Sequence, residues 1–355
     1  MRRLSIGFIV GLLVLLLTAE LALAGENGEG PFIREYPGLS LQQHILGPVC
    51  LSLPASPLDL NCNPAFLARE EKHQVRLNLI ASDQLPAVND YREKLAANDS
   101  IGIVNKVLDQ REPVMARASA GLWYQQNWWA LGWVPFRGGF ASSTRNPSYP
   151  SIAADIYKES ELFGKVGLLT ADDPNLQIGF QLRYVERTFF SRQFDLLDAV
   201  GDPAKLNIDR QRVLYLEPGL SYSFDSNPWD SMIAATLTQA AVFQDGKKSS
   251  FYPVLDLGFS TSPPFAGRKL RTSTHYTNHP DITDLFSRFR WAAIYDFANA
   301  AAATLTIGRS TAGIAVNGHV DSLVLGLGWK TEEVILDQWQ AARVSTILFE
   351  CGLVF

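Results

Sequence analysis

Long stretches of this chain alternate between apolar residues and small or polar residues, and this alternation limits the fold more than any other feature. In the stretch NLQIGFQLRY, residues 175–184, Leu, Ile, Phe, Leu and Tyr occupy one face, and Gln, Gly, Gln and Arg occupy the other. VLYLEPGLSYSF and SLVLGLGWK repeat the pattern. Alternating segments of about ten residues, separated by turn residues, are typical of a transmembrane antiparallel β-barrel.

A large secreted β-sandwich would also alternate, but composition favours the barrel. Hydrophobic residues make up 47% of the chain and charged residues only 19%. The polar faces carry Gly, Ser, Thr and Gln rather than Lys and Glu, which suits an enclosed lumen. Tryptophans gather near the expected turns, as an aromatic girdle at the membrane interface requires: they are Trp123, Trp128, Trp129, Trp133 and Trp229. We predict an all-β fold, a barrel without a separate soluble domain.

The alternation predicts about fourteen strands, an even number as in bacterial barrels. They are 74–81, 114–124, 128–136, 154–169, 175–188, 212–225, 230–243, 251–260, 267–277, 286–298, 301–309, 312–317, 320–330 and 341–355. Twelve strands remain an alternative if 301–309 and 312–317 are not strands. Short and long connections alternate, and the long ones, 82–113, 137–153, 189–211 and 331–340, should face outside. Segments 82–113 and 192–200 are predicted to form short helices in these external loops.

Residues 1–24 have the pattern of a secretory signal peptide. Arg2 and Arg3 precede an apolar run, and Ala22-Leu23-Ala24 provides a small-residue cleavage site. An uncleaved anchor is the alternative, but the run is shorter than the ~20 residues of a spanning helix. We therefore predict export.

The chain ends on an apolar, alternating strand whose last residue is aromatic. Phe355, Leu353 and Phe349 share one face of STILFECGLVF. This ending resembles the recognition signal of bacterial outer-membrane barrels, and it predicts the barrel assembly machinery as a partner. The expected location is the bacterial outer membrane, with the lipid bilayer and lipopolysaccharide around the barrel.

Residues 25–73 show no strand period, yet they are too apolar for a solvated linker, so we predict an N-terminal plug ahead of a barrel at 74–355. The stretch NCNPAFLA, which runs into the first strand, resembles the Asn-Pro-Ala-x-Leu-Ala signature of the FadL-type superfamily of outer-membrane barrels. The matched residues are Asn63, Pro64, Ala65, Leu67 and Ala68. Phe66 stands where that family usually has a small residue, and a plain Asn-Pro turn is the alternative reading.

The resemblance implies a hatch that blocks the lumen and moves to admit hydrophobic or amphipathic, fatty-acid-like small molecules. The superfamily also contains TraF-like members, associated with conjugation, and PorV-like members, associated with protein secretion. A structural or assembly component of a conjugation or secretion apparatus is therefore the alternative function, with those machineries' proteins as partners.

The chain has three cysteines and five histidines, which limits the disulfides, metal sites and catalytic groups that it can form. Cys50 and Cys62 could close a small loop in the plug, with two free thiols as the alternative, and Cys351 should face lipid. No histidine stands at metal-ligand spacing, and no Gly-x-Ser-x-Gly motif is present. The sequence predicts no metal, no cofactor and no enzymatic activity, and a formal net charge of −5 gives no reason to expect nucleic acid as a partner.

A basic cluster is expected on the lumen wall. Alternation turns Lys269, Arg271 and His275 of one strand inward, together with Arg288 and Arg290 of the next. A symmetric connection would place His275 opposite Arg288. The cluster is interpreted as a cradle for the carboxylate of a fatty-acid-like ligand. Pairing with lipopolysaccharide, or with the lumenal acids Asp256, Asp296 or Glu217, is the alternative.

Overall fold

The computed structural model describes most of the chain from residue 39 onward. The described residues are 39–56, 58–69, 73–86, 90, 93, 102, 105, 114–145, 151–170, 173–195, 209–224, 228–246, 253–278, 284–298, 300–337 and 340–355. The predicted signal peptide, the first part of the predicted plug and most of the predicted helical segment 82–113 lie outside them.

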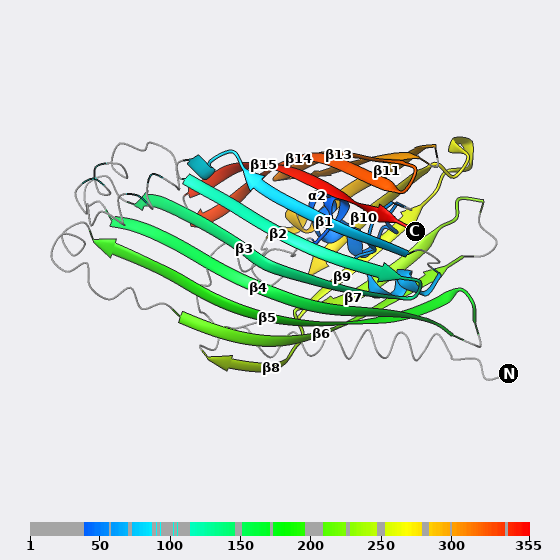
Figure 1. Ribbon diagram of the computed structural model, residues 1–355, viewed down its shortest axis with the longest axis horizontal. Coiled ribbons are helices and arrows are strands. Elements are labelled where there is room, and N and C mark those ends of the chain that lie inside the picture. The colour runs from blue at the N-terminus through cyan, green and yellow to red at the C-terminus, as the bar shows by residue number, and fades with distance from the viewer. Residues whose placement is uncertain are drawn as a thin grey trace.

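The described strands form one antiparallel sheet that closes on itself (Figure 1). Except at β8, which pairs with β6 and is bypassed by a β7–β9 pairing, each strand pairs with its neighbours in the chain, and β15 pairs with β1 to close the barrel. Of the fifteen strands, β7 and β8 both pair with β6 and share one position in the wall, so the barrel has fourteen positions. The fourteen-strand prediction is confirmed, and the doubtful pair β12 and β13 hydrogen-bonds to each other.

The strands follow the predicted segments closely. Their bounds are β1 His73–Ser82, β2 Val114–Gln126, β3 Trp129–Arg145, β4 Ser151–Leu169, β5 Leu176–Asp195, β6 Asp209–Ser223, β7 Met232–Thr238, β8 Ala241–Gly246, β9 Val254–Thr261, β10 Leu270–Asn278, β11 Phe289–Ala298, β12 Ala301–Gly308, β13 Thr311–Val320, β14 Leu323–Asp337 and β15 Gln340–Val354. The helical pieces are α2 Leu41–Leu46 and the 3₁₀ turns η1 Gly47–Leu51, η2 Pro64–Arg69, η3 Pro264–Ala266 and η4 Leu285–Arg288.

Alternation places apolar side chains outside and polar side chains inside the barrel. On β5, Phe180 and Leu182 are 41% and 48% exposed, whereas Gln181 and Arg183 are each 4% exposed. On β15, Ile347, Phe349 and Leu353 are exposed and Glu350 is buried. In a bilayer, the closed sheet satisfies every strand's backbone groups and the outer side chains meet lipid. The structure is that of a transmembrane β-barrel.

The two ends of the barrel differ. Both termini of the barrel lie at one end, since Gln74 pairs with Val354, and the connections at that end are short. Asn127 and Asp321 have φ of 49° and 54° in two-residue turns, the backbone that such hairpins require. Bacterial barrels keep both termini in the periplasm, and we take this end as periplasmic.

Several predictions at the external end need correction. β3, β5 and β14 extend to residues 145, 195 and 337, well into segments expected as loops. Residues 192–195 continue β5 and pair with β4, so the part of the predicted helix 192–200 that the structure describes is strand. Cross-strand pairing outweighs local helical preference there. Among the described residues, no helix is long and apolar enough to cross a membrane.

Residues 39–69 lie inside the wall, where α2, η1 and η2 form a compact body near the periplasmic half (Figure 1). Its apolar side chains are nearly all buried. Three of its clusters with the wall are Leu46, Val49 and Leu51 against Ala292 and Ile294; Leu60 and Leu67 against Trp123 and Phe163; and Leu41 and Ile45 against Ala315 and Leu348. We call residues 39–69 the plug.

Candidate functional site

The plug segment that carries the Asn-Pro-Ala motif packs against three neighbouring glycines of the wall. Gly167, Gly179 and Gly219 pair across β4, β5 and β6 and turn their bare backbone inward. A Cβ atom on Gly167 would lie 2.3 Å from the Ala68 nitrogen, and one on Gly179 would lie 2.2 Å from the Pro64 carbonyl carbon. Only glycine allows η2 to approach the wall this closely.

Asn63 bonds both to the plug and to the barrel wall through its side chain. Its Oδ1 accepts from the backbone N–H of Ala65 at 3.0 Å, and its Nδ2 donates to the carbonyl oxygens of Leu51 and Leu220, at 3.0 and 3.3 Å. Leu51 belongs to the plug and Leu220 to β6. The residue therefore joins the plug to itself and to the barrel, a role beyond that of a plain turn.

Three cations of the wall hold the plug between its two cysteines. Arg271 Nη1 donates to the carbonyl oxygens of Pro54 and Ala55, at 2.9 and 2.7 Å. From β4, Lys165 Nζ donates to the carbonyl oxygens of residues 61 and 62, both at 3.1 Å. From β1, Arg76 Nη2 reaches the Leu58 carbonyl oxygen at 3.0 Å. Charge-assisted bonds to buried carbonyls are the stronger kind.

A disulfide closes the segment that these cations hold. Cys50 and Cys62 are bonded, with Cα atoms 5.5 Å apart and twelve residues of separation, and both are 2% exposed. They pack in the cluster formed with Ala292, Ile294 and Ala302 of the wall. Cys351 is a free cysteine of intermediate exposure.

The beginning of α2 is capped by two carboxyl groups. Glu350 Oε2 of β15 accepts from the Leu41 N–H at 2.9 Å, and Asp59 Oδ2 accepts from the Gln42 N–H at 3.0 Å. Burial raises the pKa of Asp59, while its hydrogen bonds act in the opposite direction. Burial also lowers the pKa of His44 on α2 well below its usual range. The plug thus docks partly onto the last strand.

Ser52, His275 and Asp256 form the bonding pattern of a hydrolase triad. Ser52 Oγ lies 3.1 Å from His275 Nδ1, and His275 Nε2 lies 3.0 Å from Asp256 Oδ1. However, the Ser52 and Leu53 N–H groups already donate to the Val49 carbonyl, and Ser52 packs directly against Gly258. Ser52 is 1% exposed, and the two N–H groups that could serve as oxyanion donors are engaged. The contacts fasten the plug to β9 and β10.

External to the plug, the inner faces of β3–β6 carry a buried ion-pair network. Arg137 Nη1 contacts Glu159 and Glu161 at 2.5 and 2.9 Å. Arg183 contacts Glu161 and Glu217 at 3.6 and 3.0 Å, and Arg187 contacts Glu159 at 2.9 Å. These alternating charges fill this side of the lumen.

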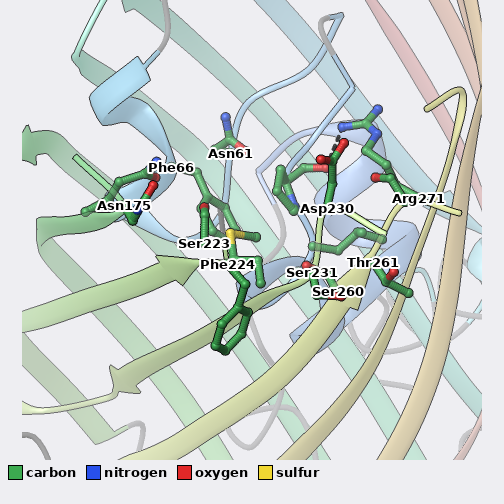
Figure 2. Close-up of a pocket in the computed structure, with 15 residues that line it drawn as sticks. Asn61, Phe66, Asn175, Ser223, Phe224, Asp230, Ser231, Ser260, Thr261 and Arg271 are labelled. Atoms are coloured by element: carbon green, nitrogen blue, oxygen red, sulfur yellow. Dashed lines mark hydrogen bonds between the residues drawn. The ribbon is translucent and has the colours of Figure 1, made fainter. Parts of the chain in front are cut away.

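Between the plug and the periplasmic end lies a cavity of about 450 Å³, shown in Figure 2. The plug contributes Leu53, Pro54, Asn61 and Phe66, of which three are apolar. The barrel contributes Asn175, Gln177, Ser223, Phe224, Asp230, Ser231, Met232, Ser260, Thr261, Ser262 and Arg271, of which nine are polar. The cavity therefore has an apolar plug face and a polar barrel face.

The five residues of the predicted basic cluster do not gather at one site in the structure. Lys269 is exposed in the turn before β10, and Arg288 ends η4, where it bonds Tyr276 and Asn278. His275 pairs with Arg290, so the predicted register with Arg288 is wrong by two residues, because η4 occupies part of the connection. Arg271 bonds Asp296 at 2.8 Å and His275 bonds Asp256, which are the acids of the alternative interpretation. Only Arg271 lines the cavity.

Several residues of the site escaped sequence reasoning. Lys165, Glu350 and Ser52 were not singled out from the sequence, although all three contact the plug or the wall in the structure. Trp123, placed in the girdle, is 1% exposed and lies under Arg76, whose guanidinium is 5.8 Å from the ring centre. The inward glycines were the available signal, because bare backbone on a lumen wall indicates close packing there. Among the described residues, no cluster of His, Cys, Asp and Glu could hold a metal ion.

Comparison with known proteins gives a likeness of fold. No family model matches the chain, and no curated protein matches it. Among solved structures, the chain is similar to the TodX deltaS2S3 mutant monoaromatic hydrocarbon channel, at 10% identity and a TM-score of 0.53, over 90% of this chain and 99% of that one. It is also similar to the Ralstonia pickettii toluene transporter TbuX, at 10% identity and a TM-score of 0.50, over 90% and 98%.

The class of protein follows from the barrel, the internal plug and these likenesses. The chain is a transmembrane β-barrel of fourteen strand positions. Its fold is similar to that of these two hydrocarbon channels, in line with the barrel architecture expected from the resemblance at Asn63–Ala68. At 10% identity the likeness concerns the fold, and substrates are a separate question.

Proposed function

We propose that this protein is an outer-membrane channel that admits hydrophobic or amphipathic small molecules past its plug. The main observation in support of this proposal is the cavity between the plug and the periplasmic end of the wall. A closed barrel filled by a separate internal body needs a path around or past that body, and the cavity is a stopping point on it. Proteins of similar fold are described as a monoaromatic hydrocarbon channel and a toluene transporter, which supports this class of cargo.

The hatch proposal is that the plug shifts as molecules pass. The plug is a contiguous piece of chain held mainly by side-chain bonds rather than by backbone pairing with the sheet. Such bonds can be exchanged one at a time without opening the barrel. Fatty-acid-like cargo was expected from the basic cluster, of which Arg271 alone lines the cavity, where it already bonds the plug and Asp296.

The test locks the plug to the wall. Ser52 Oγ and Ser273 Oγ are 2.9 Å apart, so Ser52→Cys with Ser273→Cys should form a cross-link between plug and β10. Cells that carry the oxidised double variant should take up a radiolabelled amphiphile at the rate of cells without the protein. The single variant Ser273→Cys should keep the wild-type rate.

Uptake by the locked variant at the wild-type rate would contradict plug movement. The alternative, a role in a conjugation or secretion apparatus, predicts a different result. It requires a stable protein partner that co-purifies with the intact barrel, together with uptake no higher than in cells without the protein.

A further inference from the structure

The two faces of the cavity differ in what they offer a ligand. Leu53, Pro54 and Phe66 of the plug present apolar surface, whereas the barrel face presents hydroxyl and amide groups. In Figure 2, Ser223, Ser260 and Thr261 come from β6 and β9 beneath, Ser231 directly precedes β7, and Asn61 and Phe66 come from the plug above. Ligand cavities are usually lined mainly by apolar groups, and here ten of fifteen residues are polar.

The charged groups at the cavity are already engaged. Arg271 donates to two plug carbonyls through Nη1, and its Nη2 lies 2.8 Å from Asp296 Oδ2. Asp230 Oδ2 lies 2.8 Å from Arg268 Nε. An entering carboxylate would have to take Arg271 from these partners, and breaking such a pair costs free energy.

Hydroxyl groups, in contrast, are available to a ligand. Within the described part of the chain, the side chains of Ser223, Ser260 and Ser262 make no hydrogen bond to protein. A hydroxyl is one donor and two acceptors, so it can pair with another hydroxyl in either direction. A ligand without polar groups would displace water from these serines and leave them unpaired, which costs free energy.

We propose that the cavity selects neutral amphiphiles that carry a hydroxyl group on a compact apolar body. The apolar body lies on the plug face and the hydroxyl pairs with the serines of the barrel face. A site built to pair with a hydroxyl discriminates strongly against the analogue that lacks it. This inference rests on the proposed channel function and names the substrate class of the same cavity.

The experiment compares three ligands with one apolar body: 3-phenylpropan-1-ol, 3-phenylpropanoate and propylbenzene. Binding to the full-length, detergent-solubilised protein is measured by equilibrium dialysis at pH 7. The alcohol is expected to bind at least about tenfold more tightly than the acid or the hydrocarbon. Ser223→Ala with Ser260→Ala should bring the affinity for the alcohol close to that for propylbenzene.

The matched control is Ser142→Ala, which removes a buried hydroxyl on β3 that does not line the cavity. It should leave the alcohol preference unchanged. Each variant is first shown to be folded by heat-modifiable migration. Equal or tighter binding of the acid, equal binding of propylbenzene, or an unchanged preference in the double serine variant would each overturn the inference.

The outcomes separate this inference from the channel function. Binding and uptake of all three ligands without preference would leave the channel proposal standing and refute the substrate class. If none of the three binds and none is taken up, both proposals fail.

Discussion

At the scale of single residues, the glycines of the wall decide whether the plug can seat. Gly167 has no room for even a methyl group, because a Cβ atom would meet the backbone of Leu67 and Ala68. Backbone does not yield as the far end of a side chain does. Overpacking of this kind costs about 1–3 kcal/mol.

Gly167→Ala should therefore displace η2 and increase the open-channel conductance of the protein in planar lipid bilayers. Gly164→Ala, on the outer face of the same strand, is the matched control, because its Cβ would make only an ordinary contact with Leu131 at 3.4 Å. Equal conductance in the two variants would contradict the close seating of η2.

The bond between Cys50 and Cys62 gives a second prediction at this scale. Mass spectrometry of an unreduced digest of the mature protein should find the peptides of the two residues linked, and neither thiol alkylated in the native protein. Replacing both by serine should lower the free energy of unfolding of the plug by about 3 kcal/mol, the value for a loop of this size. The plug should then be cleaved more readily by protease. Free, alkylatable thiols at both positions would refute this.

Arg271 and Lys269 stand two positions apart and differ in their contacts. Arg271 bonds the plug and Asp296, whereas Lys269 is exposed in the turn. Arg271→Ala should raise conductance and protease sensitivity of the plug, because two buried carbonyls lose their donor. Lys269→Ala should change neither. If both variants behave like the wild type, the clamp has no role in holding the plug.

At the scale of elements, β15 connects assembly to plug docking. Its outer face carries Phe349 and Leu353, and its inner face carries Glu350, which caps α2. Phe355 lies at its end, 75% exposed, with its N–H bonded to the His73 carbonyl of β1 at 2.9 Å.

Deleting Phe355, or changing it to Ser, should reduce the amount of folded barrel in outer-membrane fractions rather than the transport by each barrel. The reason is that an exposed terminal aromatic does little for the stability of the finished sheet but is available to an assembly factor. Heat-modifiable band intensity measures the yield. An unchanged yield would count against the assembly signal.

The buried ion-pair network spans four strands, and breaking it should cost more stability than breaking an exposed ion pair. Glu161 is fully buried and contacts Arg137 and Arg183. Glu161→Gln would leave two buried guanidinium groups with one partner fewer, which should destabilise the barrel by about 3–5 kcal/mol. Arg212→Ala, which removes the exposed pair with Glu186, should have little effect. Unfolding in guanidinium from lipid vesicles measures both.

At the scale of the whole molecule, the sequence predicted the wall far better than the site. Lipid imposes one rule on every strand, that outer side chains be apolar, so each strand can be recognised by itself. Leu182 and Arg183 reveal their faces without reference to any partner. The positions of all fourteen strands could be predicted for this reason.

The site depends on contacts between residues far apart in the chain. Leu41 and Glu350 are 309 residues apart, and nothing local shows that they meet. Arg271 was correctly turned inward, but its partners Pro54 and Ala55 lie more than two hundred positions away. The predicted register of β10 and β11 was wrong because residues 285–288 form η4 instead of strand, which makes the connection longer than expected. Such details follow from how the plug seats, which no periodicity encodes.

The burial of Cys50 and Cys62 has a consequence for the timing of biogenesis. Once the plug is seated, both sulfurs lie between the plug core and the wall, at 2% exposure, beyond the reach of a soluble oxidoreductase. The bond must therefore be made while this stretch is still outside the barrel. Burial in the finished fold thus makes oxidation a step that precedes seating of the plug.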